Sequence, residues 1–198
     1  MFTGIVQELG TVVKAERAKG LVRLTIAAPK TAARVQRLES IAVNGVCLTA
    51  VSVHPPTMTC EVIRETQGLT TLASLCRGDR VNVEPSLLLT DRLNGHLVMG
   101  HVDGMGTVVR RRQLPNELVI ELRIANPLRT LLVPKGPVTV DGVSLTVGSA
   151  LTASTFTLHL IPETLRQTSL RSLAVGDRVN VEVDYLAKLV RQFLQRRR

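Results

Sequence analysis

The sequence predicts an all-β protein made of two similar barrel-like domains and one C-terminal helix. Three observations predict this architecture: blocks of sequence that occur twice, short strand-like segments between turn residues, and helical spacing of apolar residues at the chain end. The length of 198 residues suits two domains of about 100 residues each. Because only 2% of the residues are aromatic, the cores must be built from Val, Leu and Ile.

The strongest signal is an internal duplication. The block GDRVNVE occurs at Gly78–Glu84 and again at Gly176–Glu182, and 13 of the 20 residues of Glu65–Glu84 are identical in Glu163–Glu182. Two more pairs of blocks keep the same order in both halves: VNGVCLT with VDGVSLT, and GIVQELGTV with GHVDGMGTV. A period of about 95 residues is typical of a duplicated small domain rather than a solenoid. The predicted domains are therefore 1–97 and 98–184, followed by a helix over 185–198.

Each copy contains short segments rich in Val, Ile and Thr, which Gly, Pro, Asn and Asp separate. In the first copy these predicted strands are 10–16, 21–28, 40–46, 48–53, 57–63 and 80–84. About six closely spaced strands favour a small closed barrel or sandwich over a parallel α/β sheet, and closure removes exposed edges. Residues 30–40 and 127–135 are candidates for short helices between strands.

The last residues change to a helical period. Their apolar members recur on one face: Leu186, Leu189, Val190, Phe193 and Leu194. Asp184 is well placed to cap this helix. A short isolated helix is marginal, so the apolar stripe must pack either on its own barrel or against other subunits, and an oligomer contact is the favoured alternative.

Charge and composition narrow the function classes. The net charge is +9 and the pI about 10.5, with basic runs at Arg110–Arg112 and in the tail (Arg191, Arg196, Arg197 and Arg198). Nucleic-acid binding is disfavoured, because the stacking aromatics that it needs are nearly absent. We expect no membrane helix and no signal peptide, and a cytoplasmic location. Three cysteines without a CxxC pair argue against disulfides and against a metal site.

Polar residues that differ between matched positions are the candidates for chemistry. Asp141 aligns with Asn44, Ser144 with Cys47, and His101 with Ile5. Lys135 has no basic counterpart in the first repeat. Each also has an ordinary structural interpretation. The Asp-Gly and Asn-Gly pairs are hairpin turn signals, free cysteines are usually buried, and His96 is interpreted as a turn residue.

Taken together, these blocks resemble the riboflavin synthase family of the alpha-chain type, with two lumazine-binding repeats. MFTGIV at the first residue, VNGVCLT, GHLVMGHVDG, VDGVSLTV and LIPETL carry the resemblance over essentially the whole chain. It implies two six-stranded Greek-key β-barrels plus a C-terminal helix, and a homotrimer. It also implies a dismutation of two molecules of 6,7-dimethyl-8-ribityllumazine into riboflavin and 5-amino-6-(ribitylamino)uracil, without cofactor or metal, at a site between the N-terminal barrel of one subunit and the C-terminal barrel of its neighbour.

The resemblance also implies which residues bind substrate. For the first barrel these are Phe2, Thr3, Gly4, Ile5, Val6, Ser40, Cys47, Leu48, Thr49, Glu61, Val62, Ile63, Arg64, Glu65 and Thr66. For the second barrel they are Gly100, His101, Val102, Lys135, Ser144, Leu145, Thr146, Ile161, Pro162, Glu163, Thr164, Leu165 and Arg166. The catalytic candidates are Ser144 and His101 first, then Cys47, Asp141 and Asp184.

Two alternatives to an enzyme stay open at this point. One is a non-catalytic lumazine- or riboflavin-binding protein of the same fold, and the other is a basic barrel that binds nucleic acid. The sequence also leaves open an association with a lumazine synthase. Because the candidate residues of both repeats are retained, the enzyme is the preferred hypothesis.

Overall fold

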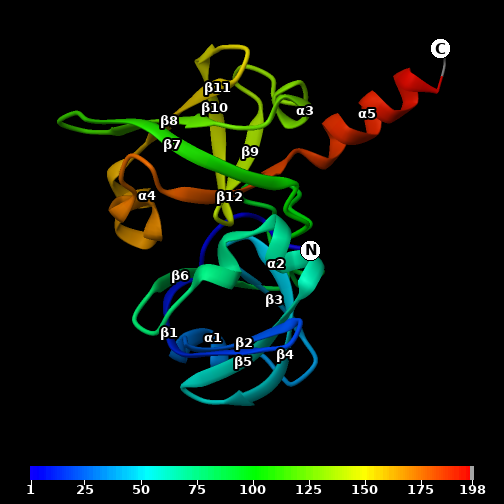
Figure 1. Cartoon of the computed structure of the whole chain (residues 1–198), viewed down its shortest axis with the longest axis vertical. Helices are drawn as coiled ribbons and strands as arrows, with labels where there is room; N and C mark the ends of the chain where they lie inside the picture. The colour runs from blue at the N-terminus through cyan, green and yellow to red at the C-terminus, as the bar shows by residue number, and fades with distance from the viewer. Residues whose placement is uncertain (197–198) are drawn as a thin grey trace.

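The computed structural model describes residues 1–196 and contains two closed six-stranded antiparallel barrels, stacked one above the other in Figure 1. Barrel 1 consists of β1 (Glu8–Ala18), β2 (Leu21–Ala27), β3 (Ser40–Val43), β4 (Val46–His54), β5 (Thr57–Ile63) and β6 (Arg80–Pro85). Barrel 2 consists of β7 (Gly104–Gln113), β8 (Leu118–Arg123), β9 (Pro137–Val140), β10 (Val143–Leu151), β11 (Thr155–Leu160) and β12 (Arg178–Val183). The predicted pair of barrels is confirmed.

The two barrels share one topology. Around barrel 1 the strands run β1-β2-β5-β4-β3-β6, and barrel 2 repeats this cyclic order with β7-β8-β11-β10-β9-β12. Hairpins connect β3, β4 and β5, and β2, which precedes them in the chain, lies beside β5. This arrangement is a Greek key. The duplication seen in the sequence is therefore a duplication of the fold.

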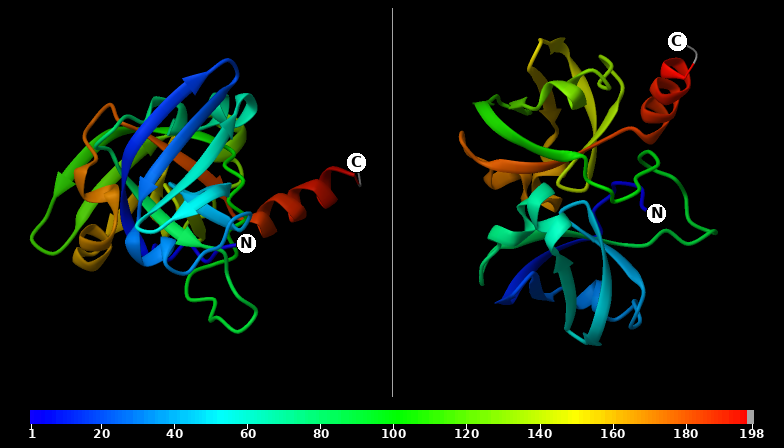
Figure 2. Two further views of the ribbon diagram at one scale, coloured as in Figure 1. Left: turned by 90° about the horizontal axis from the view of Figure 1, so that it is seen from below. Right: turned by 45° about the vertical axis from the view of Figure 1, so that its right-hand side comes forward.

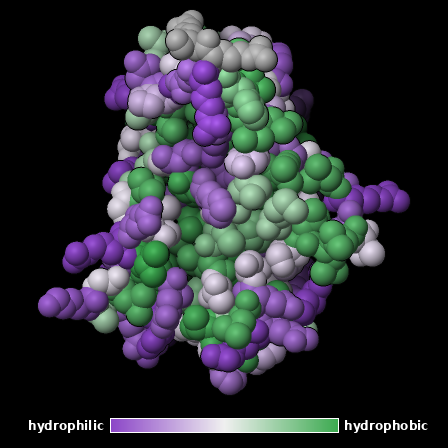
Figure 3. Space-filling view, turned by 90° about the vertical axis from the view of Figure 1, so that its right-hand side faces the viewer, coloured by the Kyte–Doolittle hydropathy of each residue, from purple (hydrophilic) through white to green (hydrophobic). Residues whose placement is uncertain are grey.

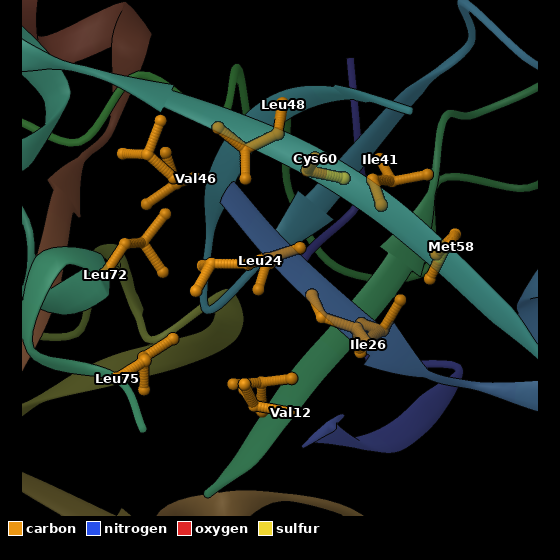
Figure 4. Packing of buried hydrophobic residues seen from close by; sticks show 14 of the residues in the cluster. Val12, Leu24, Ile26, Ile41, Val46, Leu48, Met58, Cys60, Leu72 and Leu75 are labelled. Atoms are coloured by element: carbon orange, nitrogen blue, oxygen red, sulfur yellow. The ribbon is translucent and has the colours of Figure 1, made fainter. Parts of the chain in front are cut away.

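Aliphatic side chains fill both cores, as the composition requires. In barrel 1, side chains from β1, β2, β4 and β5 point toward one another in Figure 4, among them Val12, Leu24, Ile26 and Met58. Fully burying side chains of this size contributes about 1.5–3 kcal/mol each. Cys60 belongs to the same core, and burial raises the pKa of its thiol to about 12, so the expectation that it is an ordinary core residue is confirmed.

Short helices connect the strands at matched places. In barrel 1 these are α1 (Pro29–Ala32), α2 (Arg64–Leu69) and the 3-10 helix η1 (Thr71–Ser74). Their counterparts in barrel 2 are α3 (Asn126–Arg129), α4 (Pro162–Gln167) and η2 (Ser169–Ser172). Both helices expected between strands are present, although each spans a single turn.

The C-terminal helix α5 (Tyr185–Gln195) projects away from both barrels (Figure 2). Asp184 caps it, because its carboxylate accepts a hydrogen bond from the Leu186 N–H. The predicted helix and cap are confirmed for the described residues, whereas Arg197 and Arg198 lie outside them. Among residues 1–196, no helix has the length and apolar character needed to cross a membrane.

Two duplicated asparagines join the barrels. The side-chain amide of Asn82 donates to the Asp141 carbonyl of barrel 2, and that of Asn180 donates to the Asn44 carbonyl of barrel 1, each at 2.8 Å. Their side-chain oxygens accept from the N–H of Ser169 and Thr71, at 2.7 and 2.8 Å.

The hairpin turns complete this inter-barrel clamp, which we define as the two asparagines with Asn44 and Asp141. The side chain of Asn44 accepts from the Asn82 N–H, and that of Asp141 from the Asn180 N–H, both at 2.8 Å. All four residues are buried. Buried polar groups need hydrogen-bond partners. In the clamp, each barrel supplies the asparagine side chain that bonds to the buried turn of the other barrel.

We expect N82A to destabilise the protein by about 2–4 kcal/mol, because it leaves a buried carbonyl and an N–H without their partner. Urea denaturation measures the change, and N116A in the exposed β7–β8 turn is the control. Equal stabilities of the two variants would contradict a clamp.

Candidate active site

The segments that precede the barrels cross over to the opposite barrel. Val6 packs against the core of barrel 2, and Val102 packs against the core of barrel 1. Phe2 and Val98 pair where the two segments meet, at a short antiparallel bridge. Each crossing segment, residues 2–6 or 98–102, therefore forms a wall of the other barrel.

A glycine makes each crossing possible. Gly4 and Gly100 have φ of +75° and +76°, a region in which other residues are strained. A Cβ on Gly4 would lie 2.7 Å from the Ser144 Cβ, and one on Gly100 would lie 2.6 Å from the Cys47 Cβ. The Gly4 carbonyl accepts from the Ser144 N–H, and the Gly100 carbonyl from the Cys47 N–H, at 2.7 and 2.8 Å.

A buried carboxylate holds the other edge of each segment. Glu84 accepts from the N–H groups of Thr3 and Gly4 and from the Thr3 hydroxyl, at 2.7, 3.1 and 2.8 Å. Glu182 accepts from the N–H groups of Met99 and Gly100 at 2.8 and 3.0 Å. Burial raises the pKa of both carboxyls, and these donors oppose the rise. Each crossing segment is thus fixed on both edges.

A cavity of about 240 Å³ lies between barrel 1 and the second crossing segment. It is lined by Val46, Cys47, Glu65, Thr66, Leu69, Thr70, Gly100, His101 and Val102. We refer to it as the barrel 1 pocket. The prediction that Gly100–Val102 belong to the pocket of the second barrel is wrong for this chain, because the segment crosses over to barrel 1. Gly4 and Val6 likewise face barrel 2.

The matching place in barrel 2 surrounds Ser144. The Ser144 hydroxyl lies 2.7 Å from Nδ1 of His96, and Nε2 of the same ring lies 3.1 Å from the hydroxyl of Thr139. His96 reaches this place because its N–H donates to the Thr3 carbonyl of the first crossing segment. Sequence analysis interpreted His96 as a turn residue and missed it.

Burial lowers the pKa of His96, and the charge of Asp184 opposes this shift. The ring is therefore neutral at pH 7. In the tautomer with hydrogen on Nε2, the ring donates to Thr139 and leaves Nδ1 to accept the hydroxyl proton of Ser144. This arrangement of nucleophile, base and orienting hydroxyl suits proton transfer.

The surroundings of Cys47 in barrel 1 are apolar by contrast. Cys47 is half-buried against a cluster of Phe2, Ala42 and Val98. Ala42 pairs with Cys47 in the β3–β4 ladder just as Thr139 pairs with Ser144 in the β9–β10 ladder. At these matched ladder positions the duplicated frame thus carries an apolar neighbour for Cys47 and a hydroxyl neighbour for Ser144.

Several predicted site residues do not line the barrel 1 pocket. Leu48 and Val62 belong to the barrel 1 core, and Glu61 forms an exposed ion pair with Arg23 at 2.6 Å. Other predicted residues are exposed on the barrels or at the rims: Thr49, Ile63, Arg64, Lys135, Thr146, Ile161, Pro162, Glu163 and Arg166. Four are partly buried: Ser40, Leu145, Thr164 and Leu165.

Asp141 is placed in the inter-barrel clamp and not in either pocket. Its matched residue Asn44 makes the same hydrogen bond, so the clamp explains the position of Asp141, and its catalytic role stays a prediction. Asp184 caps α5 and acts on His96 through its charge.

Comparison with known proteins agrees with the duplicated fold. A family model described as the lumazine binding domain matches residues 3–86 and again 99–184. Riboflavin synthase of Mycobacterium bovis is 43% identical over 198 residues, which covers 98% of each chain. Riboflavin synthase of Bacillus subtilis is 39% identical over 196 residues, or 99% of this chain and 91% of the relative.

The chain belongs to the riboflavin synthase family. Enzymes of this name are transferases, and so is this chain. Two solved structures share the fold at 24% identity: LumP complexed with riboflavin, with a TM-score of 0.87 over 93% of this chain and 100% of that chain, and LumP complexed with 6,7-dimethyl-8-(1'-D-ribityl) lumazine, with a TM-score of 0.84 over 92% and 99%. The full-length relatives named riboflavin synthase favour the enzyme over a non-catalytic binding protein.

The buried Asp141 predicts a pH-dependent stability for this protein. Burial raises its pKa from 3.8 to about 7. Between pH 4 and 7 the native state therefore keeps a proton that the unfolded chain has lost, and stability falls as the pH rises.

We expect D141N to abolish this loss, so that the variant exceeds the wild type above pH 7 by on the order of 2–4 kcal/mol and matches it near pH 4. Urea titrations across this range measure the difference. A difference that does not change with pH would contradict the assignment.

Proposed function

We propose that the chain binds two molecules of 6,7-dimethyl-8-ribityllumazine and transfers a four-carbon unit from one to the other. The products are riboflavin and 5-amino-6-(ribitylamino)uracil. Two identical substrates contain together the same atoms as the two products, so the transfer balances without an oxidant or reductant. The observation that carries this proposal is a pair of matched sites, namely the barrel 1 pocket at Cys47 and the place in barrel 2 where Ser144 and His96 share a hydrogen bond.

The two pockets support different roles. The lumazine C7 methyl group is acidic, so the reaction needs a base that removes this proton and a second ring that accepts the carbanion. Neutral His96 can take a proton through the Ser144 hydroxyl, which it contacts at 2.7 Å. Binding both substrates turns their encounter into an effectively unimolecular step.

The barrel 1 pocket supplies positioning. Thr66 offers a hydroxyl and Glu65 a carboxylate at its wall, and His101 adds an imidazole from the crossing segment. These groups match the polar edge of a pteridine ring, while Val46 and Val102 offer apolar contact to its faces. Thr164 is the matched hydroxyl in barrel 2.

The helix α5 supports assembly into a homotrimer. Leu186, Val190 and Phe193 lie on one face and are 60, 58 and 66% exposed. Figure 3 shows apolar surface gathered on the side of the molecule from which the helix projects. A stripe of this kind normally packs against another helix. In such a trimer, barrel 1 of one subunit would face barrel 2 of its neighbour across the two substrates.

A reducing compartment, the cytoplasm, is the location that suits the chain. Cys47, Cys60 and Cys76 are all free thiols, and Cys76 is exposed. Exposed thiols persist where glutathione and thioredoxin keep them reduced.

We expect S144A to lower turnover by about 100-fold and to leave the affinity for riboflavin close to that of the wild type, because general acid–base groups act on the transition state. The assay mixes purified protein with 6,7-dimethyl-8-ribityllumazine, without cofactor, and follows the green fluorescence of riboflavin. S149A, an exposed hydroxyl on the same strand, is the control. Unchanged turnover in S144A would remove this residue from the mechanism, and an inactive wild type would refute the proposed function.

We expect replacement of Leu186, Val190 and Phe193 by Gln to yield monomers, because the apolar stripe that joins subunits is lost. Sedimentation velocity measures the state, with Q192A on the same helix as the control. Trimers of the triple variant, or monomers of the wild type, would contradict assembly through α5.

A further inference from the structure

The C-terminal helix bonds to the rest of the molecule through two basic side chains. Lys188 donates to Asp103 at 2.7 Å, and Arg191 donates to the Pro127 carbonyl and the Thr130 hydroxyl, at 3.1 and 2.8 Å. The two contacts reach different parts of barrel 2. Arg191 reaches the short helix α3, whereas Lys188 reaches the end of the second crossing segment.

Asp103 follows directly after Gly100–Val102, the stretch that lines the barrel 1 pocket. Its carboxylate accepts from the Val183 N–H at 2.9 Å as well as from Lys188, and its own N–H donates to the Val181 carbonyl. The side chains of Asp103 and Lys188 are only 21 and 23% exposed. This carboxylate thus joins the pocket wall, β12 and α5.

The first repeat lacks this junction. Gln7 occupies the matched position, since its N–H donates to the Val83 carbonyl as that of Asp103 does to Val181. The Gln7 amide donates instead to the Ile5 carbonyl. Pro85 matches Val183 and has no N–H to donate. Only the second repeat, which α5 follows, therefore combines the carboxylate of Asp103 with the Val183 N–H and with Lys188.

The crossing segment is consequently held at both ends of the stretch that faces the pocket. At one end Glu182 and the Cys47 N–H fix Gly100. At the other end Lys188 and the Val183 N–H fix Asp103. His101 and Val102 lie between these two fixed points, so their placement depends on both.

We infer that Asp103 is a positioning residue through which helix α5 sets the placement of His101 and Val102 in the barrel 1 pocket. This inference rests on the proposed function, because it concerns the affinity of that pocket for lumazine. It makes the pocket of barrel 1 dependent on a helix that belongs to the end of barrel 2. Loss of the ion pair removes one of the contacts that hold this end of the pocket wall, and binding must then restrict its greater freedom.

The test compares D103N and K188Q with the wild type in the riboflavin synthase assay. Both variants are expected to raise KM about fivefold with kcat changed less than twofold, since a partly buried ion pair has about this effect on a binding equilibrium. K188R, which keeps the pair, is expected to restore the wild-type KM. R191A is the matched control, because it removes the other contact of α5 without touching the crossing segment.

The oligomeric state of each variant is measured at the assay concentration by sedimentation velocity. A raised KM in D103N and K188Q, with R191A and K188R like the wild type and all variants in the same state, supports the inference. An unchanged KM in D103N overturns it, as does a rise of equal size in R191A or a rise that accompanies dissociation. Inactivity of the wild type would instead refute the proposed function.

Discussion

Reciprocal hydrogen bonds between the two barrels are the constraint on which the other features depend. Each duplicated asparagine, Asn82 or Asn180, donates to the hairpin turn of the opposite barrel and accepts from the start of the opposite 3-10 helix. An amide has a donor and an acceptor on one planar group, so it satisfies both partners only in one orientation. The clamp therefore sets how the barrels meet, and with it where each crossing segment enters its neighbour.

This constraint explains which parts of the repeat stay alike. The block VNVE contributes both the clamp asparagine and the glutamate that holds a crossing segment, so its two copies must agree. The residues that line the pockets lie outside this frame. Cys47 and Ser144 contact the crossing glycines through the same backbone N–H, and their side chains are free to differ.

The fold was predictable from the sequence because its signals are local and occur twice. Turn residues and strand composition act over a few residues, and the second repeat confirms both of them. The helical stripe of α5 occurs once, but it too is a local signal. The crossing of residues 2–6 and 98–102 was not predictable, because no local pattern tells which barrel a strand-like segment joins. His96 was missed for another reason: it follows the local turn signal Asn94-Gly95, and its contact with Ser144 spans 48 residues of the sequence. The structural role of Asp141 was not predictable, because Asn44 and Asp141 differ between the repeats although the buried turn accepts either side chain.

In the proposed reaction, the two molecules of one substrate have different roles, since one loses a proton and the other accepts the resulting carbanion. The duplication supplies two similar cradles, and the departures from it separate their chemistry. Beside Ser144 lie His96 and Thr139, where barrel 1 has Phe2 and Ala42 beside Cys47. Under the proposed function, the half-buried His96 beside Ser144 would take the proton from one lumazine, while the shared backbone frame holds both crossing segments in the same way.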